Sequence, residues 1–168
     1  NVNFNTEGKF GFAGAFNGSS SYVDIPYSHG NTSFSWSLWV NGSSFGQYPT
    51  VIGGMNGTAN TNNGTIWMTS SQIVIHGTTK YGSVSYSFST NTWYHVGMVY
   101  DSSANTIQAI INGTLYTPPS TTSTTFPNQN IIRIGRADAV STAWNGKIDQ
   151  VRIYDSALSA ENVTTLYE

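Results

Sequence analysis

The stretch Phe34-Ser-Trp-Ser-Leu-Trp-Val40 decides the fold class, because large apolar and small polar residues alternate along most of it. Phe34, Trp36 and Leu38 fall on one face of an extended strand, and the serines between them fall on the other. This period of two predicts a β-strand with one face in a core. Strand signals recur along the chain, at residues 10–16, 21–25, 49–53, 65–68, 73–75, 83–88, 93–100, 106–111, 114–116, 131–135 and 147–154.

Turn signals separate these segments at short intervals. Asn-Gly, Gly-Gly and Pro-Pro pairs occur at residues 41–42, 53–54, 63–64, 112–113 and 118–119. About a dozen short strands joined in this way are typical of an all-β fold, which we predict to be a two-sheet antiparallel jelly-roll sandwich. We also predict one short C-terminal helix over residues 158–167, because Ser159 suits an N-cap and Val163, Leu166 and Tyr167 follow at helical spacing.

The composition excludes several classes of protein. The 168 residues are 14% aromatic and only 8% charged, with a net charge of −2 and no cysteine, and Ser (22), Thr (21) and Asn (17) are abundant. This aromatic content excludes a disordered chain. Six scattered basic residues make nucleic-acid binding improbable, and no apolar run approaches the ~20 residues of a membrane span.

The neutral polar composition favours an extracellular location, or one on a cell or virion surface. We expect a single domain over residues 1–168, because the length suits one core. The chain opens on Asn1 rather than Met, so we further expect it to be excised or processed from a larger extracellular protein with neighbouring domains.

Three segments together suggest a family. They are Ala15-Phe-Asn-Gly-Ser-Ser-Ser-Tyr-Val-Asp-Ile-Pro26, Asn91-Thr-Trp-Tyr-His-Val-Gly-Met-Val-Tyr-Asp101 and Trp144-Asn-Gly-Lys-Ile-Asp-Gln-Val-Arg-Ile-Tyr154. In this order they resemble the motifs of laminin-G-like jelly rolls of the concanavalin-A-like lectin/glucanase superfamily. The resemblance extends from Ala15 to Tyr167 and implies a fold rather than an activity.

Two of these segments repeat one pattern. Phe16-Asn-Gly and Trp144-Asn-Gly are each followed, at the same spacing, by Val-x-Ile at Val23 and at Val151. One interpretation is a chance recurrence of a common turn-and-strand pattern. The other places the two Val-x-Ile strands side by side, and the sequence leaves both open.

Catalysis is not expected, although the superfamily includes glucanases. Those enzymes carry paired carboxylates on a strand with the pattern E-x-D-x-x-E. Here the glutamates are Glu7, Glu161 and Glu168, and no E-x-D occurs. The histidines lack a G-x-S-x-G partner motif, and we expect His95 to be a hydrogen-bonded strand residue, as its position in the family motif implies.

The resemblance implies a possible calcium cofactor. In relatives the ion often lies where the turn before the first motif strand approaches the aspartate of the last one, which corresponds here to Asn17, the Gly18 carbonyl and Asp149. Asn17 and Gln150 replace two carboxylates of the family pattern, so such a site would be weak. The alternative is that Asn17-Gly18 is only a turn and Asp149 only caps backbone groups.

Carbohydrate binding needs aromatic rings for stacking, with amides and hydroxyls beside them. The aromatic candidates are Tyr27, Tyr48, Trp67, Tyr81 and Trp144, although Trp67 lies in an alternating strand and Trp144 at the family's aromatic plug position. The polar candidates are Asn56, Asn60, Asn62 and Asn63 in an Asn-rich loop over residues 56–64, which we expect at the rim of the sandwich.

Seven N-x-S/T triplets make glycosylation a prediction as well, because roughly four are expected by chance from these residue counts. They begin at Asn17, Asn31, Asn41, Asn56, Asn63, Asn112 and Asn162. The sequence therefore predicts a non-catalytic extracellular recognition or adhesion module, most simply one that binds glycans or glycoproteins. The alternative is an architectural domain of a surface filament, fibre or capsid with no glycan ligand.

Overall fold

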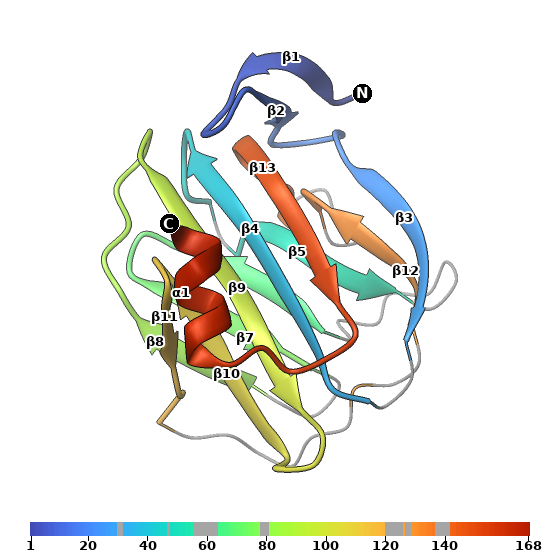
Figure 1. The fold of residues 1–168 in the computed structure, drawn as a ribbon. Coiled ribbons are helices and arrows are strands. Elements are labelled where there is room, and N and C mark those ends of the chain that lie inside the picture. The colour runs from blue at the N-terminus through green and yellow to red at the C-terminus, as the bar shows by residue number, and fades with distance from the viewer. Residues whose placement is uncertain are drawn as a thin grey trace.

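The computed structural model of the chain describes residues 1–29, 32–46, 48–55, 64–77, 81–119, 126, 129–136 and 142–168, except the side chains of His29 and Tyr81. Within these residues the strands form two antiparallel sheets, and one helix follows them (Figure 1). The seven-stranded sheet has the order β1 (Asn3–Glu7), β2 (Phe12–Asn17), β13 (Asn145–Tyr154), β4 (Phe34–Gly42), β9 (Trp93–Asp101), β10 (Thr106–Ile111) and β11 (Thr114–Tyr116). The six-stranded sheet has the order β3 (Val23–His29), β12 (Gln129–Ile134), β5 (Thr50–Met55), β6 (Thr65–Met68), β7 (Gln72–His76) and β8 (Tyr81–Ser85).

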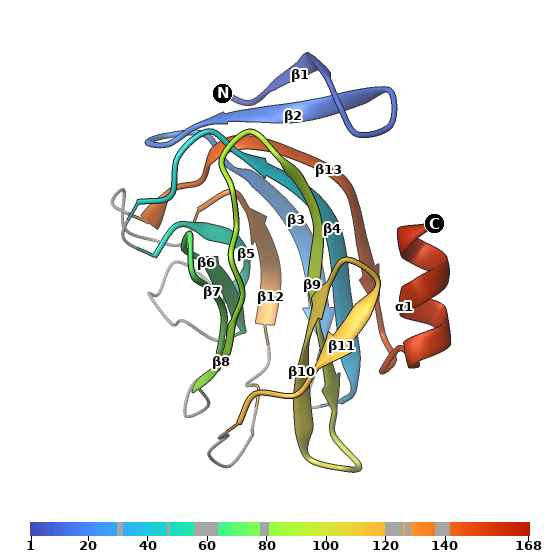
Figure 2. The same cartoon turned by 90° about the vertical axis from the view of Figure 1, so that its left-hand side faces the viewer.

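The two sheets pack face to face around one main hydrophobic core (Figure 2). Phe34, Trp36 and Leu38 of β4 point into it and are completely buried, as the alternation predicts. The six-stranded sheet supplies Ile66 and Met68 of β6 and several other isoleucines and valines from its inner face. The predicted sandwich is therefore confirmed.

The C-terminal helix α1 (Ala160–Tyr167) covers the outer face of the seven-stranded sheet (Figure 2). Its N-cap is Ser159, whose hydroxyl accepts a hydrogen bond from the Asn162 N–H, while the Asn162 side chain accepts one from the Ser159 N–H. Val163 is fully buried and packs with Val99 of β9 and Ile110 of β10. This packing explains why β9 is apolar on both faces, because α1 covers the second one.

The sequence prediction misses one strand, β1, whose polar residues at alternate positions hide its pairing with β2. The hairpin of β1 and β2 lies across one end of the sandwich (Figures 1 and 2).

The strands of the internal repeat do not lie side by side, since Val23 is in β3 of one sheet and Val151 is in β13 of the other. The two Asn-Gly turns nevertheless meet, because Asn17 pairs with Asn145.

Candidate functional site

An aromatic cluster lies on the outer face of the six-stranded sheet, formed by Tyr48, Trp67 and His76. Because Ile66 and Met68 point into the core, Trp67 between them points outward. Its ring stacks on His76 of β7 with centroids 5.0 Å apart and planes 18° apart. Tyr48 packs on Trp67 with a centroid distance of 5.3 Å.

Tyr48 is the exposed member of this cluster. Its side chain is 41% exposed, whereas Trp67 and His76 are half-buried. Its backbone φ is 60°, which is uncommon for a bulky residue and is further disfavoured here because Pro49 follows. The Pro49 carbonyl accepts a hydrogen bond from the Met68 N–H, which fixes this segment beside β6. Strained backbone conformations cluster at functional sites, so the strained Tyr48 with its exposed ring indicates a binding role.

The structure thus brings together Tyr48 and Trp67, which the sequence analysis proposed separately. The sequence analysis did not propose His76. A signal for it was present, because the short connection from Met68 to Gln72 sets the strand register. In that register Thr65 pairs with His76 and Trp67 pairs with Val74. Tyr81 of β8 pairs with His76, which places its backbone next to the cluster. The proposed loop residues Asn56, Asn60, Asn62 and Asn63 lie outside the described residues, between β5 and β6.

Two aromatic candidates belong to the core instead. Trp144 is completely buried and packs edge-on against Phe45, with ring centroids 6.1 Å apart. A buried indole cannot stack on a ligand at the surface, so the prediction of a ligand contact was wrong for Trp144. Tyr27 is half-buried on the inner face of β3 and packs against the same core.

The proposed calcium ligands are not gathered into one cluster. The Asn17 Oδ1 atom accepts hydrogen bonds from the N–H groups of the three residues that form its turn, Ser19, Ser20 and Ser21. The Gly18 N–H donates to the Trp144 carbonyl. Asn17 is paired with Asn145, and Asp149 lies four residues farther along β13, which is about 13 Å on an extended strand.

Asp149 instead accepts hydrogen bonds from one backbone N–H of the β1–β2 connection and from one of β13 itself. Its Oδ2 accepts a hydrogen bond of 3.0 Å from the Phe10 N–H, and its Oδ1 accepts one of 2.7 Å from the Gln150 N–H. The carboxylate is also so close to Gly8 that a Cβ there would lie 2.6 Å from Oδ2. These contacts favour the capping role, and Asn17, Gly18 and Asp149 as placed do not fit a shared calcium ion. Within the described part of the chain, no group of three or more His, Asp or Glu side chains has metal-site geometry. Calcium binding stays a prediction.

The glycosylation prediction is not tested, but several of its residues can be placed. Asn17 and Asn162 are exposed, and Asn41 is half-buried on β4. Asn112 is held in the β10–β11 turn, where its Oδ1 accepts from the His95 N–H and its Nδ2 donates to the Tyr86 hydroxyl. Asn31, Asn56 and Asn63 lie outside the described residues.

His95 is a hydrogen-bonded strand residue, as predicted. It is completely buried on β9, and its Nε2 shares a hydrogen bond of 2.7 Å with the Ser37 hydroxyl of β4. Burial, together with the positive charge of Arg152, lowers the pKa of His95 from 6.5 to about 4. The imidazole is therefore neutral at physiological pH.

No helix among the described residues combines the length and the hydropathy needed to cross a membrane.

Comparisons with solved structures place this fold among known jelly rolls. Domain 4 of AbnA, a GH43 extracellular arabinanase from Geobacillus stearothermophilus in complex with arabinotriose, matches with a TM-score of 0.77 and 22% identity over 100% of this chain and 82% of that one. A heptameric SAP-like pentraxin from Limulus polyphemus matches with a TM-score of 0.71 and 15% identity, over 92% and 80% of the two chains. The binding domain of botulinum neurotoxin serotype G gives 0.71 and 18%, and there the match covers 99% of this chain but 44% of the toxin domain.

A search of curated protein sequences finds no match. The sequence model of one family does match, over residues 17–164, which is most of the chain. That family is Laminin_G_3, and its model carries the description of the concanavalin A-like lectin/glucanase superfamily. The match includes the turn at Asn17-Gly18, the motif strands and most of α1. The chain therefore belongs to the Laminin_G_3 family of the concanavalin A-like lectins and glucanases.

Proposed function

We propose that this chain is an extracellular, non-catalytic carbohydrate-binding domain, in which a sugar ring stacks on the cluster of Tyr48, Trp67 and His76. The observation that carries the proposal is the exposed Tyr48 ring, held against Trp67 by a strained backbone. Sugars present an apolar face to aromatic rings, and such a contact removes apolar surface from water on both partners.

Sugar hydroxyls need hydrogen-bond partners such as amides, in addition to a ring for stacking. The Asn-rich segment of residues 56–63 joins β5 to β6, the strand that carries Trp67. An aromatic surface with a few polar groups such as amides is the usual composition of a small-ligand site.

The similar arabinanase domain supports the same class of ligand, because it was solved in complex with arabinotriose. The likeness is at 22% identity, so it does not transfer that sugar to this chain. The proposal is limited to a neutral glycan that presents a stackable ring face.

A glycan array tests the proposal, with the chain probed once with calcium and once with a chelator. Binding to a defined set of glycans is expected, and calcium dependence would show whether the cofactor prediction also holds. An absence of binding across diverse glycans under both conditions would contradict the proposal and support the architectural alternative.

A further inference from the structure

Exposed phenylalanines gather on the hairpin of β1 and β2. Phe4 on β1 is 63% exposed and Phe12 on β2 is 71% exposed, while Phe10 in the connection between the strands is 48% exposed. Elsewhere in the part of the chain that the structure describes, the phenylalanines are buried or half-buried. Exposed apolar side chains that cluster in this way mark an interaction surface.

Phe4 and Phe12 lie on one face of the hairpin. A Cβ placed on Gly14 would lie 3.3 Å from the Phe4 ring and 3.2 Å from the Phe16 ring, so these side chains share the face to which Gly14 points. Phe12 lies two residues before Gly14 on β2 and therefore points to the same face, about 7 Å along the strand. Phe16, at the other end of β2, is buried in the core. The face of β2 that begins in the core thus ends as an exposed surface, the phenylalanine face, formed by Phe4 and Phe12.

The free edge of β1 is less suited to a partner than this face. β1 is the outermost strand of the seven-stranded sheet, a position at which another strand can add. However, the Asn3 Oδ1 atom already accepts a hydrogen bond of 2.9 Å from the Asn5 N–H, and the strand has a bulge between Asn3 and Thr6. Both features hinder the addition of a strand. A partner is therefore expected on the phenylalanine face rather than along the edge.

The charges of the hairpin also constrain the partner. Residues 3–17 contain one basic residue, Lys9, and one acidic residue, Glu7. The Lys9 ammonium lies 4.5 Å from the centre of the Trp39 ring, on the outer face of the sheet, whereas Glu7 pairs with Phe12 at the end of the phenylalanine face. An anionic lipid surface would be matched by a basic cluster, which this segment does not contain. A nearly neutral apolar face can instead meet its own copy without strong repulsion.

We propose that the phenylalanine face joins two copies of this chain in a symmetric dimer, in which Phe4 and Phe12 of one copy pack on those of the other. A fully exposed aromatic side chain presents about 200 Å², so the two rings of each copy offer about 270 Å². Specific dimers bury about 1,200–2,000 Å² over both copies, and the rings supply less than half of the lower value. The dimer is therefore weak and reversible, and exposed residues of β1 beside Phe4 complete the contact.

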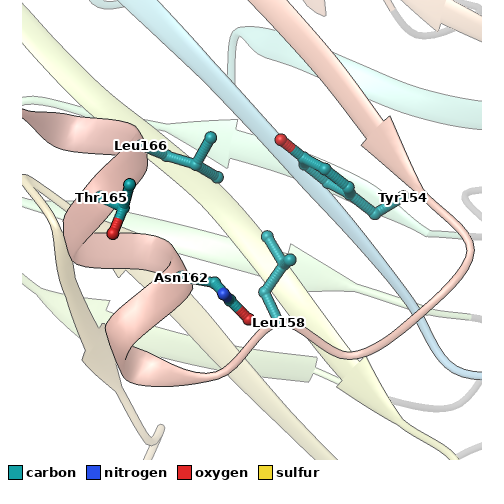
Figure 3. Close-up of a pocket in the computed structure, with 5 residues that line it drawn as sticks. All are labelled: Tyr154, Leu158, Asn162, Thr165 and Leu166. Carbon is teal, nitrogen blue, oxygen red and sulfur yellow. The ribbon is translucent and has the colours of Figure 1, made fainter.

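A different contact between copies would place an exposed ring in a cavity. A cavity of about 250 Å³ lies between α1 and β13, lined by Tyr154, Leu158, Asn162, Thr165 and Leu166 (Figure 3). Leu158 and Leu166 extend there toward the Tyr154 ring, so the cavity has an apolar lining (Figure 3). Such a contact joins two different surfaces, and it generates rings or open chains of copies. The phenylalanine face joins identical surfaces and closes at two copies.

Sedimentation velocity tests the proposal over chain concentrations from about 10 µM to about 1 mM, with NMR spectra recorded over the same dilution. A monomer–dimer equilibrium with a Kd on the order of 10–1,000 µM is expected, and association should stop at two copies. On dilution the amide signals of β1 and β2 should shift, whereas those of β6 and β7 should not.

Variants of Phe12 locate the contact. Phe12→Ser removes the more exposed ring and Phe12→Glu adds a charge that meets its own copy, so each is expected to raise the Kd about tenfold or more. Phe12→Leu keeps an apolar side chain and should stay within about threefold of the wild type. Two controls should leave the Kd unchanged. Tyr48→Ala removes an exposed ring from the outer face of the other sheet, and Thr165→Trp fills the cavity beside α1 from an exposed position.

The proposal is wrong if the chain stays monomeric up to about 1 mM, or if folded Phe12→Ser and Phe12→Glu associate as the wild type does. It is also wrong if assembly continues beyond two copies or if Thr165→Trp abolishes it, since either result assigns the contact to the cavity. A monomeric chain that binds neutral phosphatidylcholine vesicles through Phe12 would assign the face to a lipid surface instead. None of these outcomes bears on glycan binding at Tyr48, so the two proposals stand or fall separately.

Discussion

The replacement of His95 with glutamine should remove an acid-sensitive part of the stability of this fold. In the folded chain the pKa of His95 is lowered to about 4 by burial and by the charge of Arg152, whereas an unfolded chain titrates near 6.5. The unfolded state therefore binds an additional proton between these two pH values. Stability is fully present above pH 6.5 and is lost as the pH falls toward 4. At about 1.4 kcal/mol per pH unit, the loss amounts to about 3 kcal/mol.

The assay is urea unfolding of the wild type and of His95→Gln at a series of pH values from 7 to 4, followed by tryptophan fluorescence. Glutamine places a polar atom near the position of Nε2, so the hydrogen bond with Ser37 can be kept. The carboxylates titrate in both proteins, and their contribution cancels in the difference. We expect the wild type to lose about 3 kcal/mol more than the variant over this range. Equal losses in the two proteins would refute the assignment of a neutral, buried His95.

Three further variants probe the core, the helix cap and the hairpin contact. Trp144→Ala should destabilise the fold by about 3–5 kcal/mol in urea unfolding, because a fully buried indole leaves a large cavity, and a loss below about 1 kcal/mol would contradict its place in the core. Ser159→Ala should cost about 1 kcal/mol through loss of the capping box, measured in the same way, and an unchanged stability would show that the cap contributes nothing. Asp149→Ala should lower stability by about 1–3 kcal/mol in the presence of a chelator, because two backbone N–H groups lose their acceptor. If Asp149→Ala loses stability only in the presence of calcium, Asp149 would instead be a metal ligand.

The fold was predictable from sequence because its signals are local. The alternation of Phe34 to Val40, the Asn112-Gly113 turn and the N-cap at Ser159 each specify structure within a few residues. Asn112 and Gly113 indeed have φ values of 46° and 77°, as a tight hairpin turn of this kind requires. The missed strand β1 lacks such a signal, since it is short, polar and irregularly paired.

The site was only partly predictable because it depends on which strands become neighbours. Trp67 and Tyr48 were recognised by residue type, but their contact and the stacking of His76 follow from strand register and from the unusual backbone of Tyr48. Trp144 has the composition of a binding residue, and only its burial excludes it. Asn17 and Asp149 belong to neighbouring strands, yet the register separates them by about four residues.

The central claim is that a glycan binds at the exposed Tyr48 ring, and calorimetric titration of the best glycan from the array tests it most directly. The wild type should be compared with Tyr48→Ala and with Tyr167→Ala, because Tyr167 is similarly exposed, 40% against 41%, but lies on the outer face of the other sheet, against Trp39. The loss of the stacking ring should cost about 1–2 kcal/mol, a five- to thirtyfold rise in Kd for Tyr48→Ala, with no change for Tyr167→Ala. An unchanged Kd in Tyr48→Ala, or an equal rise in both variants, would contradict the assignment of the binding site.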